Sequence, residues 1–399
     1  MNACSIMMIA GEPSGDLLAA ELAGALREQW MKPLAAKVEL KLFGAGGERM
    51  TEAGVDVVFD MTQYAVVGLV EVLKNYGKFK SLFNALLAVA MARKPDAIIC
   101  VDFSGFNRRF AHAVKERVRS GACGDWNPKL IQFVSPQVWA SRPGRAEKMA
   151  LDFDLLLAIF PFEKAWYAQR TPTFHVEFVG HPILDRYAGN PPINSNEKRP
   201  DELPLIALLP GSRKGELRRH LPVICEALSL IEKAKRVRHI FVLPNADLLD
   251  YAKKLSAGYP HLVMQTGGLP DVLAKADLAI ASTGTVTLEC AYFGVPTIAL
   301  YKTSWSTYQI GKRIIKVNYL AMPNLLANEP IFPEYIQDAA TPKNLARESL
   351  EFLGNSERRN SVRAKLARVI ESLGGPGASR RAAEALFSLL HENLNAEKE

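Results

Sequence analysis

The sequence predicts an α/β protein made of two doubly wound domains, each a parallel sheet with helices on both faces. Apolar runs alternate with amphipathic stretches along the chain, which is the pattern of strand–helix–strand units. Two glycine turns, GEPSGD at 11–16 and STGTVTLE at 282–289, each follow an apolar run and lead into a helical pattern. The length of 399 residues is typical of two domains.

Short apolar runs are the expected strands, at 5–10, 38–43, 97–101, 130–133, 155–159, 205–209, 239–243, 278–281 and 297–300. A stretch rich in Pro, Asn and charge at 189–204 is the expected linker between an N-terminal domain at 1–188 and a C-terminal domain at 205–378. The amphipathic stretch 379–394 either completes the N-terminal domain or packs on a second copy of the chain in a homodimer.

The composition is that of a globular protein with a substantial core. Hydrophobic residues make up 48% and charged residues 23% of the chain. No uncharged run approaches the roughly 18 residues that span a bilayer, and no basic lead of a secretory signal is present, so we expect a cytoplasmic protein. Five cysteines are scattered without a C-x-x-C pair, which predicts buried thiols rather than disulfides or a zinc site.

The net charge of +7 indicates an anionic partner, either nucleic acid, a membrane surface or a phosphorylated substrate. Arg and Lys gather in short loops at 141–148 and 212–220. No RNP-like, zinc-finger or helix-turn-helix pattern accompanies them, so nucleic acid is not expected.

Candidate site residues of the first domain follow its strands, because ligands of such sheets bind beyond the carboxyl ends of the strands. Gly11 and Gly15 let the backbone approach a ligand, while Ser14 or Asp16 would cap the next helix. Asp102 ends the run DAIICVD and places a carboxylate at the same edge. Its alternative role is to cap the helix that follows.

Candidate site residues of the second domain suit a diphosphate. Gly211, Ser212 and Arg213 form a glycine turn with a guanidinium at a helix start, although a solvated basic turn is the alternative. The small-residue turn at 282–285 can receive phosphate on its amides, and Glu289, about one turn further, can accept two hydrogen bonds from ribose hydroxyls. This layout resembles the nucleotide-binding half of GT-B glycosyltransferases.

An ordered set of motifs sharpens the resemblance. The segments are AGEPSGD (10–16), YAVVGLVEVL (64–73), VDFSGFN (101–107), VSPQVWA (134–140), FPFEK (160–164), VGHP (179–182), LLPGSR (208–213), STGTVTLE (282–289) and MPNLLA (322–327). Together they resemble the lipid-A-disaccharide synthase family of Gram-negative bacteria over roughly residues 7–340. After VSPQVWA the chain departs from the family pattern with SRPGR at 141–145, on the side where the acceptor is expected to bind.

The resemblance implies a GT-B fold and an inverting transfer from UDP-2,3-diacylglucosamine to the 6-hydroxyl of 2,3-diacylglucosamine 1-phosphate, in a cleft between the domains. Asp102 would be the general base and Arg213 would stabilise the leaving diphosphate. The UDP-binding residues would be Gly211, Ser212, Arg213, Thr283, Gly284, Thr285, Glu289, Asn324 and Gln337, and those on the acceptor and sugar side Gly11, Glu12, Ser14 and Gly15. No cofactor and no metal are expected, since Asp152 and Asp154 of a D-x-D pattern are predicted to form a turn.

Lipid substrates imply a peripheral enzyme on the cytoplasmic face of the inner membrane. The stretch 65–94 combines an apolar face with lysines, as interfacial helices do. The expected membrane contacts are Val66, Val67, Leu69, Val70, Leu73, Lys74 and Lys78, followed by Tyr76, Phe79, Leu82 and Phe83 on the apolar face beside Lys80. The alternative is an ordinary packed helix.

Two other functions stay open from sequence. One is another UDP-sugar enzyme on the same scaffold, an epimerase or a peptidoglycan-type glycosyltransferase. The other is a noncatalytic nucleotide-binding protein at a membrane surface. His181 would either touch substrate or serve the structure.

Overall fold

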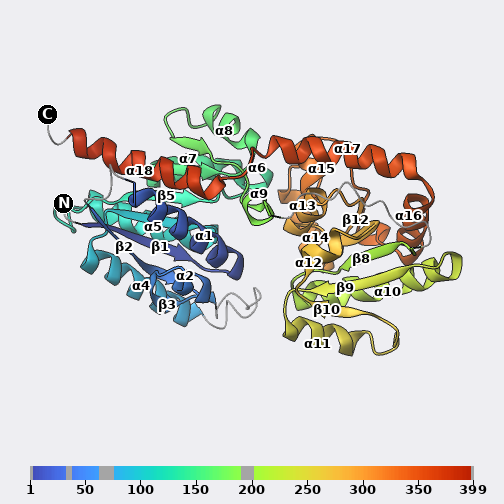
Figure 1. Ribbon diagram of the computed structural model, residues 1–399. Helices are drawn as coiled ribbons and strands as arrows, with labels where there is room; N and C mark the ends of the chain where they lie inside the picture. The colour runs from blue at the N-terminus through green and yellow to red at the C-terminus, as the bar shows by residue number, and fades with distance from the viewer. Residues whose placement is uncertain (1–2, 33–37, 63–75, 190–201, 397–399) are drawn as a thin grey trace. The chain divides into compact units, whose positions relative to one another are not determined.

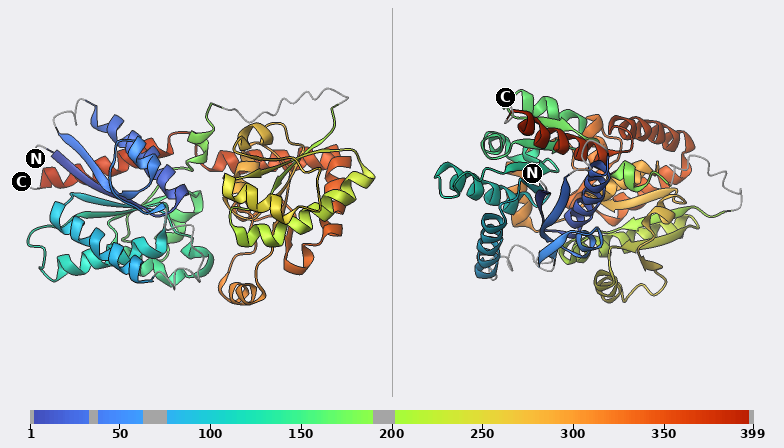
Figure 2. Two further views of the ribbon diagram at one scale, coloured as in Figure 1. Left: turned by 90° about the horizontal axis from the view of Figure 1, so that it is seen from below. Right: turned by 60° about the vertical axis from the view of Figure 1, so that its left-hand side comes forward.

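The computed structural model describes residues 3–32, 38–62, 76–189 and 202–396. The chain forms two compact units, one made of Met1–Arg186 with Leu373–Glu399 and the other of Tyr187–Ser372 (Figure 1). Each unit is a parallel sheet with helices on both faces (Figure 2). The predicted fold class is confirmed.

In the first unit, the described residues form a seven-stranded sheet in the order β3-β2-β1-β4-β5-β6-β7. Its strands are β1 (Ala3–Ala10), β2 (Glu39–Gly46), β3 (Asp56–Asp60), β4 (Ala97–Val101), β5 (Lys129–Phe133), β6 (Leu155–Ala158) and β7 (Val176–Phe178). Its helices are α1 (Pro13–Trp30), α2 (Glu48–Glu52), α4 (Tyr76–Arg93), α5 (Ser104–Arg119), α6 (Val138–Ser141), α7 (Ala146–Asp152), α8 (Pro161–Ala168), α9 (Ile183–Arg186) and α18 (Ala378–Ala396).

In the second unit, the described residues form a six-stranded sheet in the order β10-β9-β8-β11-β12-β13. Its strands are β8 (Leu205–Leu209), β9 (Arg238–Leu243), β10 (Met264–Thr266), β11 (Leu278–Ser282), β12 (Thr297–Tyr301) and β13 (Glu334–Ile336). Its helices are α10 (Lys214–Ala234), α11 (Ala246–Leu255), α12 (Leu269–Leu273), α13 (Thr285–Tyr292), α14 (Trp305–Ile314), α15 (Met322–Ala327), α16 (Pro342–Gly354) and α17 (Ser356–Ser372).

Central strands are buried on both faces, as β4 and β8 show with every residue buried. Such strands are continuous apolar runs in the sequence, which is why they could be predicted. All nine predicted strands are present in the structure. The strands that the sequence did not predict are β3, β7, β10 and β13, which are the edge strands of the two sheets.

The C-terminal helix α18 packs along α1 in the same chain (Figure 1). The Trp30 ring of α1 meets the Phe387 ring of α18 edge to face, with 5.2 Å between centroids. Of the two positions expected for 379–394, the structure places this helix on the first unit.

Helix α4 packs on the core of the first unit. Leu82 and Phe83 contact the buried cluster, and the Phe83 ring lies 5.4 Å from that of Phe106 and 5.8 Å from that of Phe110. These two side chains therefore pack on the core, as expected for the alternative of an ordinary packed helix.

The expected membrane contacts of 66–74 lie outside the described residues, and Lys78 lies in α4. Within the parts of the chain that the structure describes, no helix has the length and apolar character to span a bilayer. All five cysteines are free; Cys4 is half-buried and the other four are buried, much as predicted.

Candidate active site

The carboxyl ends of β2, β1, β4 and β5 lie side by side in the first sheet. The segments that follow these strands therefore meet at one edge, as parallel pairing requires. Ile9 of β1 pairs with Cys100 of β4, which brings the GEPSGD turn next to Asp102. The sequence prediction that these segments lie close together is confirmed.

Asp102 sits in a tight turn with left-handed backbone, at φ 48°, and Phe103 follows at φ 37°. The Asp102 N–H donates to the carbonyl of Phe133 at 2.6 Å. Its own carbonyl accepts from Asn107 Nδ2 at 2.9 Å and Gln132 Nε2 at 3.3 Å. Left-handed backbone in non-glycine residues costs about 1–3 kcal/mol each and concentrates at functional sites.

Two buried amides therefore hold the Asp102 turn, and the sequence did not single them out. Asn107 and Gln132 are both fully buried, and each donates a second bond, to Val101 at 3.1 Å and Val134 at 3.1 Å respectively. Asn107 Oδ1 and Gln132 Oε1 have no hydrogen-bond partner among the described residues. The available signals were a glutamine inside the apolar run LIQF and the asparagine that ends VDFSGFN.

The Asp102 carboxylate is adapted to take up a proton. Burial raises its pKa above the ordinary aspartate value, and a hydrogen bond from the Phe103 N–H opposes this only in part. The alternative role in capping α5 is not found, because Phe103 is the N-cap and no side chain caps this helix.

The glycines of GEPSGD pack against this turn. A Cβ on Gly11 would lie 2.2 Å from Cδ1 of Phe103, and one on Gly15 would lie 3.6 Å from Cβ of Asp102. Glu12 is the N-cap of α1 and is half-buried, whereas Ser14 is exposed in its first turn.

Asp16 does not cap its own helix, contrary to the expectation for Ser14 or Asp16, since α1 has no side-chain cap. Its carboxylate instead accepts the N–H groups of Gly47 at 2.7 Å, Arg49 at 3.0 Å and Met50 at 3.3 Å. It thereby caps α2 and ties the loops after β1 and β2 together.

Gly11→Ala is expected to lower both stability and activity, because the new Cβ displaces the Phe103 ring and the adjoining Asp102 turn. Overpacking of this kind costs about 1–3 kcal/mol. Urea unfolding and turnover number measure the two effects. Gly24→Ala is the matched control, since nothing lies within 4 Å of its Cβ position. A Gly11→Ala enzyme as stable and active as the native chain would contradict the expected clash.

A buried carboxylate, Glu163, lies at the start of α8 close to the same edge. It accepts Trp139 Nε1 at 2.9 Å and the N–H groups of Ile159 at 3.2 Å and Phe160 at 3.0 Å. Complete burial outweighs these bonds and raises its pKa to about 7.

His181 packs beside this cluster with its ring tilted against that of Phe160. Its ring centroid lies 5.5 Å from that of Phe160, and Nδ1 accepts the N–H of Ile183 at 3.1 Å. Burial, with help from Arg186, lowers its pKa to about 3, so the imidazole is neutral.

Glu163 is expected to make stability fall as the pH rises. Between pH 4.5 and about 7 the folded carboxyl holds a proton that the unfolded one has lost, so its contribution is present at low pH and lost as the pH passes 7. The difference between these pKa values corresponds to about 3 kcal/mol. His181 contributes with the opposite sign between about pH 3 and 6.5, and this contribution is common to the native chain and the variant. The measurement is therefore the free energy of unfolding of the native chain minus that of Glu163→Gln, at several pH values; a constant difference would refute it.

In the second unit, β8, β11, β12 and β13 are neighbours, and their carboxyl ends carry most of the predicted nucleotide-binding residues. Gly211 has φ 125°, and a Cβ there would lie 2.3 Å from Oε2 of Glu216. The same oxygen accepts the Ser212 N–H at 2.9 Å. Arg213 is the exposed N-cap of α10, and no hydrogen bond or ion pair of its guanidinium is found within the described residues.

The turn after β11 has free space beside its glycine, Gly284. Gly284 has φ 128° and nothing within 4 Å of its Cβ position. It is the N-cap of α13, which has no side-chain cap, and Thr285 at the first helical position is exposed. The Thr283 N–H donates to the Leu300 carbonyl at 3.2 Å. These features leave room for a ligand at the helix N-terminus.

Glu289, Asn324 and Gln337 have partners inside the unit. Glu289 Oε2 accepts the Tyr187 hydroxyl at 3.2 Å. Asn324 is completely buried and donates to the Phe332 carbonyl at 2.7 Å and Glu334 at 2.9 Å, while its Oδ1 accepts the Phe332 N–H at 2.7 Å. The Asn324 amide thus bonds within its own unit, and its expected place at the nucleotide stays a prediction.

Gln337, at φ 51°, binds the backbone of Thr303 through Oε1 at 2.7 Å and Nε2 at 3.3 Å. Lys302 Nζ donates to the Gln337 carbonyl at 2.9 Å. The buried His220 accepts the Lys302 N–H at 2.9 Å and contacts the Pro210 carbonyl at 2.7 Å, so it links the ends of β8 and β12. Lys302 and His220 were missed by sequence reasoning, since no motif marks them.

The described residues contain no group of His, Cys, Asp or Glu that could hold a metal ion. The D-x-D pattern forms the predicted turn. Asp152 ends α7 and binds His112, and Asp154 binds Lys115 at 3.0 Å.

Two doubly wound units, with a carboxylate on left-handed backbone at the sheet edge of one and open glycine turns at that of the other, define a two-domain protein of the GT-B fold class. At the level of fold, the chain is similar to the UDP-GlcNAc 2-epimerase of Neisseria meningitidis bound to UDP-GlcNAc, with a TM-score of 0.61 and 12% identity over 97% of this chain and 100% of that one. It is also similar to the glycotransferase of kitacinnamycin, with a TM-score of 0.59 and 16% identity over 98% and 100%.

The model of the lipid-A-disaccharide synthetase family matches residues 6–388. A lipid-A-disaccharide synthase of Geobacter sulfurreducens is 37% identical over 398 residues, which cover 98% of both chains. The chain belongs to the lipid-A-disaccharide synthetase family, and it is a glycosyltransferase. The family resemblance is confirmed, and the epimerase, peptidoglycan-type and noncatalytic alternatives are not favoured.

Proposed function

We propose that the chain transfers 2,3-diacylglucosamine from its UDP derivative to the 6-hydroxyl of 2,3-diacylglucosamine 1-phosphate. The products are the β-1,6-linked lipid A disaccharide 1-phosphate and UDP. The observation that carries this proposal is the family match over residues 6–388, which includes the sheet edges of both units. The bond that forms joins the acceptor oxygen to the sugar, and the bond that breaks joins the sugar to the diphosphate.

Asp102 is the proposed base of this reaction. A sugar hydroxyl is hardly acidic, so the attack needs a group that accepts its proton in the transition state. The raised pKa of Asp102 makes its carboxylate a better proton acceptor than an ordinary exposed aspartate. Gly11, Glu12, Ser14 and Gly15 are the proposed residues beside the acceptor and the reacting sugar, and the packing of both glycines against the Asp102 turn supports this.

The second unit is proposed to hold the UDP. Arg213 would stabilise the charge that grows on the diphosphate, with Gly211 and Ser212 beside it. Thr283, Gly284 and Thr285 would hold phosphate at the N-terminus of α13, and Glu289 would hold the ribose with its orientation set by Tyr187. Asn324 and Gln337 are the remaining proposed UDP-binding residues, and their internal hydrogen bonds would position the nucleotide-binding loops.

Lipid substrates place the proposed enzyme at the cytoplasmic surface of the inner membrane as a peripheral protein. The predicted contacts are Val66, Val67, Leu69, Val70, Leu73, Lys74 and Lys78, and they stay predictions. Helix α18 packs on α1 of its own chain, so nothing in its packing requires a homodimer.

The test is to mix purified protein with UDP-2,3-diacylglucosamine and 2,3-diacylglucosamine 1-phosphate in detergent and to detect the disaccharide by mass. Disaccharide and UDP in equal amounts are expected. Parallel reactions with water-soluble acceptors separate this activity from that of other UDP-sugar enzymes. UDP release without disaccharide, or transfer only to soluble acceptors, would refute the proposal.

A further inference from the structure

A basic cavity of about 370 Å³ lies between α5 and α7 in the first unit, and the reaction proposed above does not use it. Arg108, Arg109 and Arg119 of α5 line one wall, and Lys148 of α7 faces them. Met149, Leu151 and Phe153 add an apolar part, where Leu151 is 68% exposed. Cationic groups thus meet an exposed apolar side chain.

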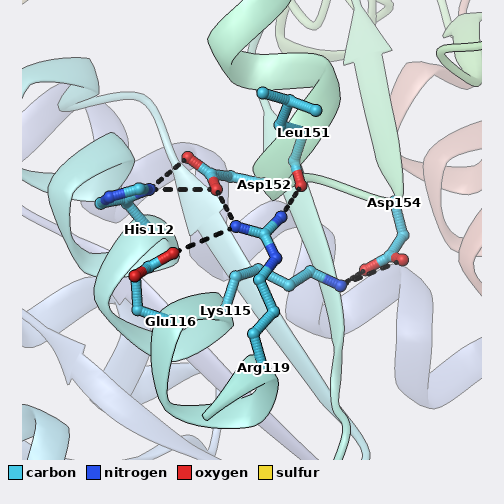
Figure 3. Close-up of polar contacts among 7 residues, drawn as sticks. All are labelled: His112, Lys115, Glu116, Arg119, Leu151, Asp152 and Asp154. Carbon is cyan, nitrogen blue, oxygen red and sulfur yellow. Dashed lines mark hydrogen bonds and ion pairs between the residues drawn. The ribbon is translucent and has the colours of Figure 1, made fainter.

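One end of the cavity is fixed by ion pairs (Figure 3). Arg119 contacts Glu116 at 3.3 Å and Asp152 at 3.8 Å, and it donates to the Leu151 carbonyl at 2.7 Å. His112 contacts the Asp152 carboxylate at 3.1 Å. These contacts tie α5 to the end of α7. They also pair Asp152, the one carboxylate among the described residues that line the cavity.

The other cations of the cavity are not neutralised. Within the described residues, no carboxylate lies within ion-pair distance of Arg108, Arg109 or Lys148, although the structure pairs Arg119 and His112. The Nε of Arg108 is buried and has no hydrogen-bond partner in the same residues. A buried donor without a partner is unfavourable, so a ligand that accepts this bond would be favoured.

Further arginines increase the positive potential. Burial lowers the pKa of Arg108, the charges of Arg109 and Arg142 lower it further, and the charge of Asp152 opposes this only in part. Burial likewise lowers the pKa of Arg145, followed by the effects of Arg108 and Arg142. Like charges held this closely destabilise the empty site, and an anion between them would relieve the repulsion.

We infer that this cavity binds the phosphate group of an acyl lipid. Guanidinium groups bind phosphate oxygens in bidentate geometry, and lysine adds a point charge. The volume suits a phosphate with a short adjoining segment, and the exposed Leu151 provides an apolar contact where an acyl chain begins. The phosphate is either the diester of a bilayer lipid or the monoester of a free amphiphile. The inference does not depend on the sugar-transfer chemistry.

The test compares the native chain with the triple variant Arg108→Gln, Arg109→Gln, Lys148→Gln. The matched control is Lys235→Gln, Arg236→Gln, Lys253→Gln, which removes three exposed cations from the second unit and lowers the net charge of +7 equally. Thermal unfolding first verifies that both variants fold. The probes are phosphatidylcholine vesicles with about one-third phosphatidylglycerol, followed by sedimentation, and hexyl phosphate, followed by thermal shift.

A bilayer-lipid site predicts that the cavity variant binds the vesicles roughly 10- to 100-fold more weakly than the native chain, whereas the control stays close to native. A free-phosphate site predicts that hexyl phosphate stabilises the native chain and the control but not the cavity variant, with vesicle binding unchanged. The inference is overturned if the cavity variant matches the native chain with both probes, or if the control loses as much as the cavity variant.

Discussion

Asp102→Asn is expected to reduce disaccharide formation at least 100-fold, because loss of a general base costs about 10²- to 10⁴-fold. Asparagine is the right replacement since it tolerates left-handed backbone, which this position needs at φ 48°. It also removes a carboxylate whose burial is unfavourable, so the variant is expected to fold normally. Turnover number and Michaelis constant are measured by mass detection of the product.

The pH profile adds a second readout that a structural role would not give. Native activity is expected to fall on acidification through the raised pKa of Asp102, and the residual activity of Asp102→Asn is expected to lack this step. Asp125→Asn, in an exposed turn, is the control. Near-native turnover in Asp102→Asn would remove the residue from the role of base.

The strands that sequence could predict are those that lie inside the sheets. A strand buried on both faces must be apolar throughout, so β1, β4, β8 and β11 stand out as runs. The edge strands β7, β10 and β13 have only three residues each and are half-exposed, so they lack that signal. Their place is determined by pairing with a neighbouring strand, which no local pattern records.

The site residues also divide into those that the sequence could predict and those that it could not. Asp102 was predictable because it directly follows a buried strand, and parallel topology sends all such residues to one edge. Gln132 and Asn107 were not, since neither a polar residue within an apolar strand nor one near a helix start reveals what it bonds. For Asn324 the motif predicts a place at the nucleotide but not the internal hydrogen bonds that the fold gives this amide.

Arg213→Ala is expected to lower turnover at least 100-fold while leaving the fold intact. Removing one preorganised group that stabilises transition-state charge costs about 10²- to 10³-fold. The side chain is exposed and makes no hydrogen bond or ion pair within the described residues. The backbone bonds from Glu216 and Leu217 to its carbonyl do not need the guanidinium. Unfolding free energy is therefore expected to change by less than about 0.5 kcal/mol.

Graded variants separate the leaving-group role from simple binding of UDP. Arg213→Lys keeps the charge without the bidentate fork, so its turnover is expected to lie between those of the native chain and Arg213→Ala. Arg218→Ala removes an exposed cation about one helical turn further along α10 and serves as the control. UDP affinity is measured by calorimetry beside turnover. If Arg213→Ala weakens UDP binding but keeps native turnover at saturating donor, the guanidinium binds substrate and transition state equally, and its proposed action on the departing diphosphate is wrong.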